Sequence, residues 1–184
     1  MKLRAGTRKS PLAMVQTYMV LDMIKAAFPE CEIEIVTFTT KGDRQLDRPL
    51  DKIGGKGVFV TEIEQALQSG EIDFAVHSAK DLPVTLGEGL EISGVCPRGN
   101  YRDMLVTQKG VVFNDSDVFT VGTGSQRRRG GFARLYPNAQ FADIRGNVGT
   151  RLKKLSEGLY DGIILCAAGT ERLGLSLSEY EVKE

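Results

Sequence analysis

The sequence predicts an α/β protein built from two lobes. Stretches rich in β-branched residues alternate with stretches whose apolar residues recur at helical spacing, which is typical of βαβ units with parallel strands. The composition, 41% hydrophobic and 26% charged, is that of a folded globular chain and not of a disordered one. It changes at Cys-Pro-Arg-Gly-Asn, residues 96–100. We therefore expect one domain at residues 1–97 and a second at 98–184.

The first lobe should open with a short strand at residues 3–6. Ser10 followed by Pro11 is typical of a helix N-cap and first turn, and apolar residues then recur at helical spacing until Pro29. Residues 32–39 alternate and are rich in β-branched side chains, which predicts the next strand. The start of this lobe is thus a strand–helix–strand unit.

The rest of the first lobe contains two loops and further short elements. A polar loop at 40–52 leads into a glycine-rich stretch at 54–57, and a helix follows that ends at Gly70. An apolar strand is expected at 72–76, and residues 90–95 are a candidate for another strand. This order continues the alternation of strands and helices.

The second lobe repeats the alternation of strands with helices. We expect strands near residues 104–107, 118–121, 140–144 and 162–167, with helices at about 125–136 and 147–157. Strands connected through helices favour a parallel sheet. The last residues, 176–184, are polar and predict no closing strand.

Composition and residue counts argue against several classes of protein. No stretch approaches the roughly 20 apolar residues of a membrane span, and the basic N-terminus is not followed by the apolar run of a signal peptide. We therefore expect a cytoplasmic protein without a membrane partner. The formal net charge of zero disfavours nucleic acid as a partner. His77 is the only histidine and the three cysteines are scattered, so no metal site is expected.

Three loops join the end of a predicted strand to the start of a helix and carry basic side chains. They lie at residues 6–10, 123–128 and 145–151. Ligands of parallel sheets bind beyond the carboxyl ends of the strands, and backbone N–H groups at helix starts attract anions. Arginine in a first helical turn opposes the helix dipole, so a bound carboxylate or phosphate would explain it. The candidate ligand-binding residues are Arg8, Ser10, Thr123, Ser125, Arg127, Arg128, Arg145 and Arg151. A solvated basic face is the alternative.

Two further loops carry candidates for chemistry. Asp81 follows Ser78 and Lys80 at the end of an apolar strand, where a carboxylate among cationic loops could stabilise positive charge or transfer a proton. Pairing with a neighbouring arginine explains Asp81 equally well on spacing alone. Lys56 lies in the glycine-rich loop but does not complete a nucleotide-binding P-loop, so a solvated lysine is as good an explanation. His77 is expected to be structural.

Four segments together resemble the hydroxymethylbilane synthase family, also called porphobilinogen deaminase. They are RKSPLA at 8–13, GGKGVF at 54–59, AVHSAKDLP at 75–83 and RGNVGTRL at 145–152. Their order and approximate spacing also match, and the similarity extends along essentially the whole chain. Each motif alone is moderately specific, whereas the set is highly specific.

The resemblance implies a fold, an activity and roles for residues. The fold would be that of type II periplasmic binding proteins, with two lobes around a cleft. The enzyme would be a transferase that condenses porphobilinogen units, with loss of ammonia, into a linear tetrapyrrole for haem biosynthesis. Asp81 corresponds to the catalytic aspartate, which stabilises the cationic azafulvene formed when ammonia leaves. The basic residues that correspond to carboxylate-binding arginines are Arg8, Arg127, Arg128, Arg145 and Arg151. Further cofactor or substrate contacts correspond to Lys56, Ser78, Lys80 and Ser125, and Phe59 matches an aromatic residue of the active-site region.

The resemblance also implies a dipyrromethane cofactor, bound through a cysteine of a third, C-terminal domain. Neither Cys31, Cys96 nor Cys166 has the Gly-Gly-Cys-x-x-Pro-like setting of that cysteine. We therefore expect that the third domain is absent, that the first lobe lacks its return segment, and that this chain is a fragment, inactive alone, of an enzyme that is a monomer at full length. Alternatives are a non-enzymatic anion-binding module of periplasmic type and a phosphate- or nucleic-acid-binding protein. Asp81 among the basic loops disfavours the first alternative, and the neutral net charge disfavours the second.

Overall fold

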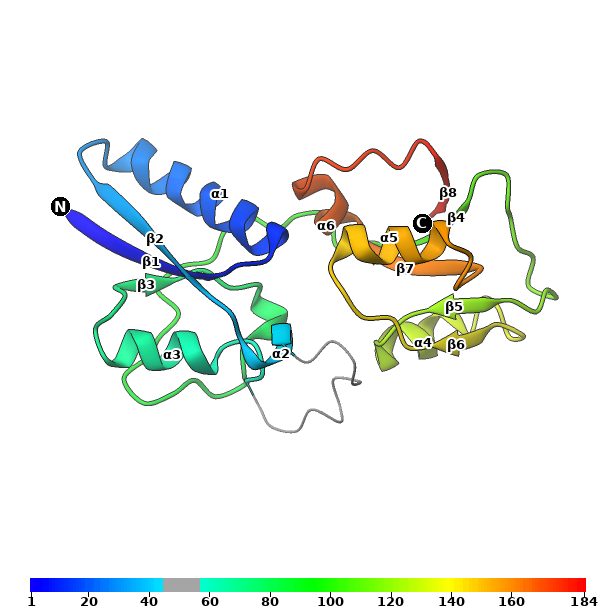
Figure 1. Ribbon diagram of the computed structural model, residues 1–184, viewed down its shortest axis with the longest axis horizontal. Coiled ribbons are helices and arrows are strands. Elements are labelled where there is room, and N and C mark those ends of the chain that lie inside the picture. Colours follow the sequence, from blue (N-terminus) through cyan, green and yellow to red (C-terminus); the bar gives the residue numbers. More distant parts are fainter. Residues whose placement is uncertain (45–56) are drawn as a thin grey trace. The chain divides into compact units, whose positions relative to one another are not determined.

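The computed structural model describes residues 1–44 and 57–184 of the chain (Figure 1). The chain divides into two compact units, Met1–Pro97 and Arg98–Glu184, called here the first and second units. Each has its own sheet and its own apolar core. In the described residues, no helix is long and apolar enough to cross a membrane.

The first unit is a three-stranded parallel sheet with a helix on each face (Figure 1). The strands are β1 (Lys2–Arg8), β2 (Glu32–Phe38) and β3 (Phe74–Ala75), in the order β2-β1-β3. The helices are α1 (Pro11–Ala27) and α3 (Thr61–Gln68). The parallel pairing of the strand–helix–strand start agrees with the pattern expected from the sequence.

Alternation along β1 explains why both of its faces are covered. Thr7 is fully buried and its hydroxyl donates to the Ala13 carbonyl of α1. Gly6 points to the opposite face, where a Cβ atom would lie 2.2 Å from Cδ1 of Ile72. Ile72 belongs to the apolar cluster with Ile63 of α3. The apolar side chains on this face therefore pack directly against the backbone of the strand.

Two parts of the first unit differ from the sequence prediction. The loop expected to begin at Thr40 contains a short helix, α2 (Lys41–Arg44). The prediction of a strand at 90–95 is wrong: these residues have no hydrogen-bonded partner strand in the described part of the chain. The side chains of Ile92 and Val95 are 60% and 85% exposed. The apolar residues that suggested a strand are therefore not buried against a sheet.

The second unit has a mixed sheet of five strands. In chain order they are β4 (Asp103–Gln108), β5 (Thr120–Gly122), β6 (Gln140–Ala142), β7 (Gly162–Cys166) and β8 (Tyr180–Lys183). The spatial order is β6-β5-β7-β4-β8, and β5 is parallel to both β6 and β7. However, β4 is antiparallel to its two neighbours, so the fully parallel sheet expected from the sequence is wrong. The prediction of no closing strand is also wrong, because β8 pairs with β4.

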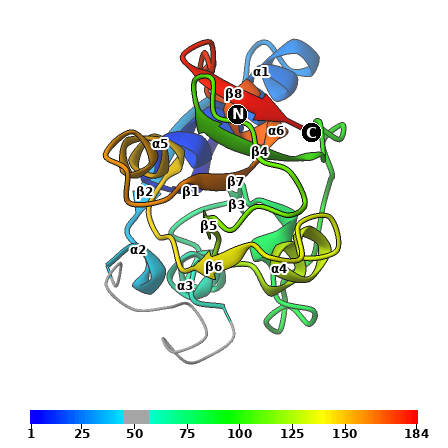
Figure 2. The ribbon, with the colours of Figure 1, turned by 90° about the vertical axis from the view of Figure 1, so that its right-hand side faces the viewer.

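Helices cover both faces of this sheet (Figure 2). They are α4 (Gln126–Phe132), α5 (Val148–Ser156) and the unpredicted α6 (Ala167–Arg172). Ile163 of β7 packs into the apolar cluster that includes Leu155 of α5, whereas the next residue, Ile164, joins the cluster that Phe132 of α4 contacts. The period of two along β7 thus sends alternate residues to opposite helices, as in a sheet covered on both sides.

Candidate functional site

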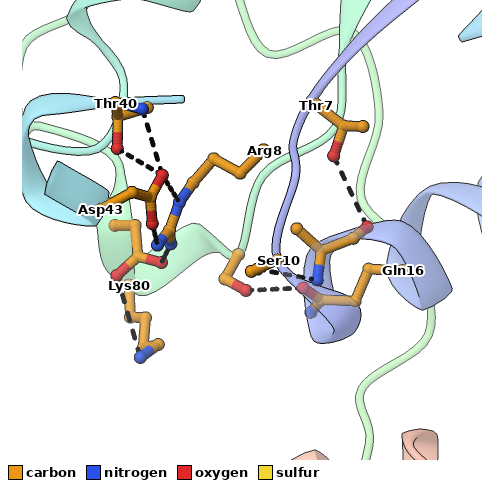
Figure 3. Close-up of polar contacts among 10 residues, drawn as sticks. Thr7, Arg8, Ser10, Gln16, Thr40, Asp43 and Lys80 are labelled. Atoms are coloured by element: carbon orange, nitrogen blue, oxygen red, sulfur yellow. Dashed lines mark hydrogen bonds and ion pairs between the residues drawn. The ribbon is translucent and has the colours of Figure 1, made fainter. Parts of the chain in front are cut away.

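In the first unit, four charged residues meet beyond the ends of adjacent parallel strands (Figure 3). We call Arg8, Asp43, Lys80 and Asp81 the Asp81 cluster. Arg8 ends β1, and Asp81 lies in a 3-10 turn (Ala79–Asp81) after β3, which pairs with β1. Arg8 Nη1 lies 3.9 Å from one oxygen of Asp81, and Lys80 Nζ lies 3.8 Å from the other. The sequence-predicted residues Arg8, Lys80 and Asp81 are therefore neighbours.

The carboxylate of Asp81 is only 20% exposed, yet neither oxygen accepts a hydrogen bond from any residue that the structure describes. Its two cationic neighbours lie beyond hydrogen-bond distance. The backbone holds the residue in place, because the Asp81 N–H donates to the Ser78 carbonyl at 2.9 Å. An ionised carboxylate has about four acceptor positions. Asp81 is thus placed to accept N–H donors of a ligand or to face a positive charge.

Asp43, which the sequence analysis did not single out, is the principal partner of Arg8. Arg8 Nε donates to Asp43 Oδ2 at 3.2 Å, and Nη2 donates to Oδ1. The backbone N–H and the hydroxyl of Thr40 also donate to Oδ2, at 3.1 and 2.8 Å. Burial alone would raise the pKa of Asp43, but the hydrogen bonds from Arg8 and Thr40 outweigh burial and hold that pKa below its ordinary value. A Thr-x-x-Asp pattern at the start of a short helix is the signal that could have indicated this carboxylate.

Phe59 packs against the same guanidinium. The Arg8 carbon Cζ lies 4.2 Å from the centre of the Phe59 ring, within the range of a cation–π contact. The ring lies so close to Gly42 that a Cβ atom there would approach Phe59 to 2.1 Å. Phe59 thus lies at the Asp81 cluster, and its role in an active site stays a prediction. Lys56, the other candidate of this motif, lies outside the described residues.

Two predicted serines have partners within the protein. Ser10 caps α1, its hydroxyl accepting from the Ala13 N–H at 3.4 Å. Ser78 donates its hydroxyl proton to Oε1 of Gln16, a residue of α1 that no sequence signal indicated, at 2.9 Å. Figure 3 shows Ser10 and Gln16 with the dashed lines of their contacts. Ser78 and Gln16 therefore join α1 to the turn that carries Asp81.

The pKa of His77 is influenced by two charges of the Asp81 cluster. Burial lowers the pKa of its imidazole, the negative charge of Asp81 raises it, and the positive charge of Arg8 lowers it, with a net decrease from 6.5. The ring is consequently neutral at pH 7. Its pKa therefore depends on the charges of both Asp81 and Arg8.

In the second unit, the basic candidates lie in two loops that follow adjacent parallel strands or in the first turns of the helices that these loops lead into. One loop links β5 to α4 and the other links β6 to α5; we call them the arginine loops. Ser125 caps α4 by accepting from the Arg128 N–H, and Asn147 caps α5 by accepting from the Thr150 N–H at 2.8 Å. The hydroxyl of Thr123, a fully buried residue, accepts from the Ser125 N–H. Ser125 and Thr123 thus shape the first loop.

Arg127 and Arg128 share one carboxylate, that of Asp103 on β4. Arg127 Nη2 lies 2.9 Å from Oδ2, and Arg128 Nη2 lies 2.8 Å from Oδ1. Arg128 also donates to the Ile164 carbonyl at 3.1 Å and is only 17% exposed, whereas the side chain of Arg127 is 75% exposed. Arg127 therefore has donors that reach solvent, while Arg128 is largely held by the protein. Asp103 was missed because its partners are more than 20 residues away in the sequence.

Arg151 is a half-buried cation with no carboxylate partner among the described residues. Its Nε donates to the Gly146 carbonyl at 2.9 Å. Burial and the positive charges of Arg128 and Arg145 all lower the pKa of Arg151. A group of like charges around a half-buried guanidinium favours a bound anion, since partly buried charges are usually paired.

The third arginine of the run, Arg129, ties the two arginine loops together. It donates through Nε and Nη2 to the Thr123 carbonyl, at 3.2 and 3.0 Å, and through Nη2 to Asp143, the residue that follows β6. The Tyr160 hydroxyl donates to the Asp143 carbonyl at 2.7 Å, and burial raises the pKa of Tyr160. Three consecutive arginines therefore have three different roles, which their adjacency in the sequence could not show.

Comparison with protein families identifies a match over nearly the whole chain. Residues 3–183 match the family model described as porphobilinogen deaminase, dipyrromethane cofactor binding domain. The chain is 50% identical over 175 residues to the porphobilinogen deaminase of Roseiflexus castenholzii, covering 94% of the chain and 57% of the relative. It is 45% identical to the probable porphobilinogen deaminase of Methanocaldococcus jannaschii, covering 98% of the chain and 61% of that relative. The chain thus spans somewhat more than half the length of these proteins.

Solved structures with low sequence identity share the fold. One is an ancestral cationic amino acid solute-binding protein, with a TM-score of 0.57 and 13% identity, covering 100% of this chain and 76% of the other. Another is HinK, a LysR family transcriptional regulator from Pseudomonas aeruginosa, with a TM-score of 0.56 and 15% identity, covering 99% and 56%. These likenesses confirm the predicted α/β fold of the type II periplasmic-binding-protein kind.

Proposed function

Because the chain belongs to the porphobilinogen deaminase family, we propose that it serves the transferase reaction that joins porphobilinogen units into a linear tetrapyrrole with release of ammonia. The observation that carries the proposal is the carboxylate of Asp81, which is mostly buried but accepts no hydrogen bond from the described residues. A pyrrole N–H donor satisfies such a carboxylate. We further propose, as expected from the sequence, that the reaction takes place in the cytoplasm and that the full-length enzyme is a monomer.

The arginine loops suit the carboxylates of the substrate. Each porphobilinogen carries an acetate and a propionate, and guanidinium groups bind carboxylates through charge-assisted hydrogen bonds. Arg127 offers exposed donors, and Arg151 is the cation that lacks a carboxylate partner in the described part of the chain. Arg145 raises the local positive charge further. In this proposal these three side chains orient the substrate by its acidic groups.

Asp81 suits the reacting end of the substrate. Loss of ammonia leaves positive charge on the pyrrole, and a fixed carboxylate nearby stabilises that charge as it develops. The turn already holds the backbone of Asp81 in place. No hydrogen bond from a described side chain to its oxygens has to break before the carboxylate can face the substrate. Lys80 is 80% exposed and lies 3.8 Å from Asp81, so it is placed to meet an acidic group of the substrate at the solvent side.

The same residues fit the dipyrromethane cofactor that the family model names. Two linked pyrroles present the same N–H donors and carboxylates as the substrate. Asp81 in the first unit has the chemistry to accept the N–H groups, and Arg127 and Arg151 in the second unit have the chemistry to bind carboxylates. When bound, the cofactor supplies the pyrrole chain to which substrate units are added. Cys31 is buried, and neither Cys96 nor Cys166 lies in the predicted attachment setting, so we propose that this chain forms no covalent bond to it. An intact mass raised by the mass of a dipyrromethane would contradict this.

Binding of porphobilinogen to the 184-residue chain, measured by calorimetry, tests the proposed function. We expect binding that weakens in Asp81→Asn and in Arg151→Gln, and no binding of a pyrrole without carboxylates. Equal affinity of porphobilinogen and a simple dicarboxylate, unaffected by Asp81→Asn, would instead indicate a non-enzymatic anion-binding module. That outcome would remove the proposed role of Asp81.

A further inference from the structure

Arg8 lies between two carboxylates but forms hydrogen bonds with only one of them. Two of its nitrogens donate to Asp43, whereas its nearest approach to Asp81 is 3.9 Å (Figure 3). The same guanidinium has the geometry to form a two-bond pair with either carboxylate. Which of the two holds Arg8 therefore determines whether Asp81 is open to a ligand.

Three contacts favour Asp43 in this competition. The backbone N–H and hydroxyl of Thr40 hold its carboxylate, and Thr40 is itself fully buried. Hydrogen bonds from Arg8 and Thr40 overcome the effect of burial and lower the pKa of Asp43, so the group stays ionised at neutral pH. The ring of Phe59 lies against the guanidinium and limits its movement. Asp81 receives no comparable hydrogen bonds from the described residues.

We propose that Asp43 is a positioning residue: by holding Arg8, it keeps the guanidinium off Asp81 and leaves that carboxylate open to the N–H groups and positive charge of a pyrrole ligand. The nature of this ligand rests on the proposed function. The hold on Arg8 does not, because it follows from contacts within the first unit. Without the charge of Asp43, Arg8 is released toward the one other carboxylate that lies near it in the described residues, Asp81.

The chain contains a matched control for this pair. Arg4, on the same strand, donates through Nε and Nη2 to the two oxygens of Asp73, at 3.1 and 2.9 Å. These are the same atoms that join Arg8 to Asp43. Arg4 has no second carboxylate in salt-bridge distance among the described residues. Asp73→Asn thus removes an equivalent pair at the other end of β1 without releasing a cation toward Asp81.

A first experiment needs no ligand. The ¹H–¹⁵N resonance of Arg8 Nε is recorded in four chains: wild type, Asp81→Asn, Asp43→Asn and the double variant. We expect Asp81→Asn to change the shift little when Asp43 is present and several-fold more when residue 43 is asparagine, because only then does Arg8 bind Asp81. The same small change in both backgrounds would overturn the proposal. Thr40→Val, which removes one donor to Asp43, should give an intermediate change and keeps the test decisive if Asp43→Asn does not fold.

A second experiment measures porphobilinogen affinity by calorimetry. Asp43→Asn should weaken binding about tenfold, near the lower end of what a charge-assisted hydrogen bond contributes, whereas Asp43→Glu should recover most of the affinity and Asp73→Asn should leave it within about twofold. The Asp43→Asn effect should disappear when Arg8→Gln is already present, since Asp43 acts through Arg8. Equal losses in Asp43→Asn and Asp73→Asn, or an undiminished loss in the Arg8→Gln background, would overturn the proposal. Failure of the wild-type chain to bind would contradict the proposed function, and the resonance experiment would still decide the role of Asp43.

Discussion

The Asp81 cluster and the arginine loops differ in how their charges are balanced. In the first unit, two cations, Arg8 and Lys80, face two carboxylates, Asp43 and Asp81. In the second unit, Asp103 forms ion pairs with two arginines, and Arg151 has no carboxylate partner among the described residues. The first arrangement suits a ligand group that is or becomes positive, and the second suits anions. A porphobilinogen unit contains both kinds of group. We therefore assign the reacting end of the substrate to the Asp81 cluster and its carboxylates to the arginine loops, as proposed above.

The largest expected effect comes from Asp81. In an active form of the protein, Asp81→Asn should lower the rate of ammonia release from porphobilinogen by about 10²–10³, as for the loss of one preorganised charge-stabilising group. Binding should fall less than the rate, and the thermal unfolding midpoint should change little, since no described side chain depends on a hydrogen bond to this carboxylate. A near-normal rate would make Asp81 an ordinary ion-pair partner and abolish the contrast between the two sites.

Arg151→Gln should weaken porphobilinogen binding by about 10-fold or more, because charge-assisted hydrogen bonds contribute roughly 1.5–3 kcal/mol. The same substitution should not lower the stability of the protein. Removing a half-buried cation that Arg128 and Arg145 repel should leave the thermal unfolding midpoint unchanged or higher. Arg128→Gln is the matched control: it breaks contacts with Asp103 and the Ile164 carbonyl and should lower the midpoint. A lower midpoint in Arg151→Gln would show that this arginine is structural.

Arg129→Ala should reduce the free energy of unfolding by about 1–3 kcal/mol, since it leaves the Thr123 carbonyl and Asp143 without their shared donor. Urea denaturation measures this change. Affinity for porphobilinogen should fall along with it, because the two arginine loops lose the side chain that joins them. Loss of affinity with full stability would instead place Arg129 among the ligand-binding residues.

The smallest expected effect concerns pH. Because the folded state lowers the pKa of His77, the unfolded chain takes up a proton first, and stability should fall as the pH drops below 6.5. NMR titration of this single histidine should give a midpoint below 6.5, and Asp81→Asn should lower it further by removing the charge that raises it. His77→Gln should remove this part of the pH dependence. A midpoint that does not respond to Asp81→Asn would show that the two groups do not interact.

Local patterns in the sequence predicted most helices and parallel strands, because periodicity and capping residues act over a few positions. The direction of β4 and the existence of β8 depend on pairing between residues more than 50 positions apart, which no local pattern contains. The same distinction holds in the sites. Glycine, capping and basic residues at strand ends predicted the strand-to-helix connections at whose ends Arg8, Arg127 and Arg151 lie. Asp43 and Asp103 were missed because their importance lies in contacts with distant arginines.

Gly6 restricts which sequences can carry this site. A Cβ atom at this position would lie 2.2 Å from Cδ1 of the buried Ile72, so alanine would force that side chain to move within the apolar cluster. Overpacking of this kind typically costs about 1–3 kcal/mol. Arg8 is two residues further along the same strand, so Gly6 packs close to the residue that pairs with Asp43. A residue without a side chain thus limits the divergence of the chain, since its replacement would disturb the packing beside the Asp81 cluster.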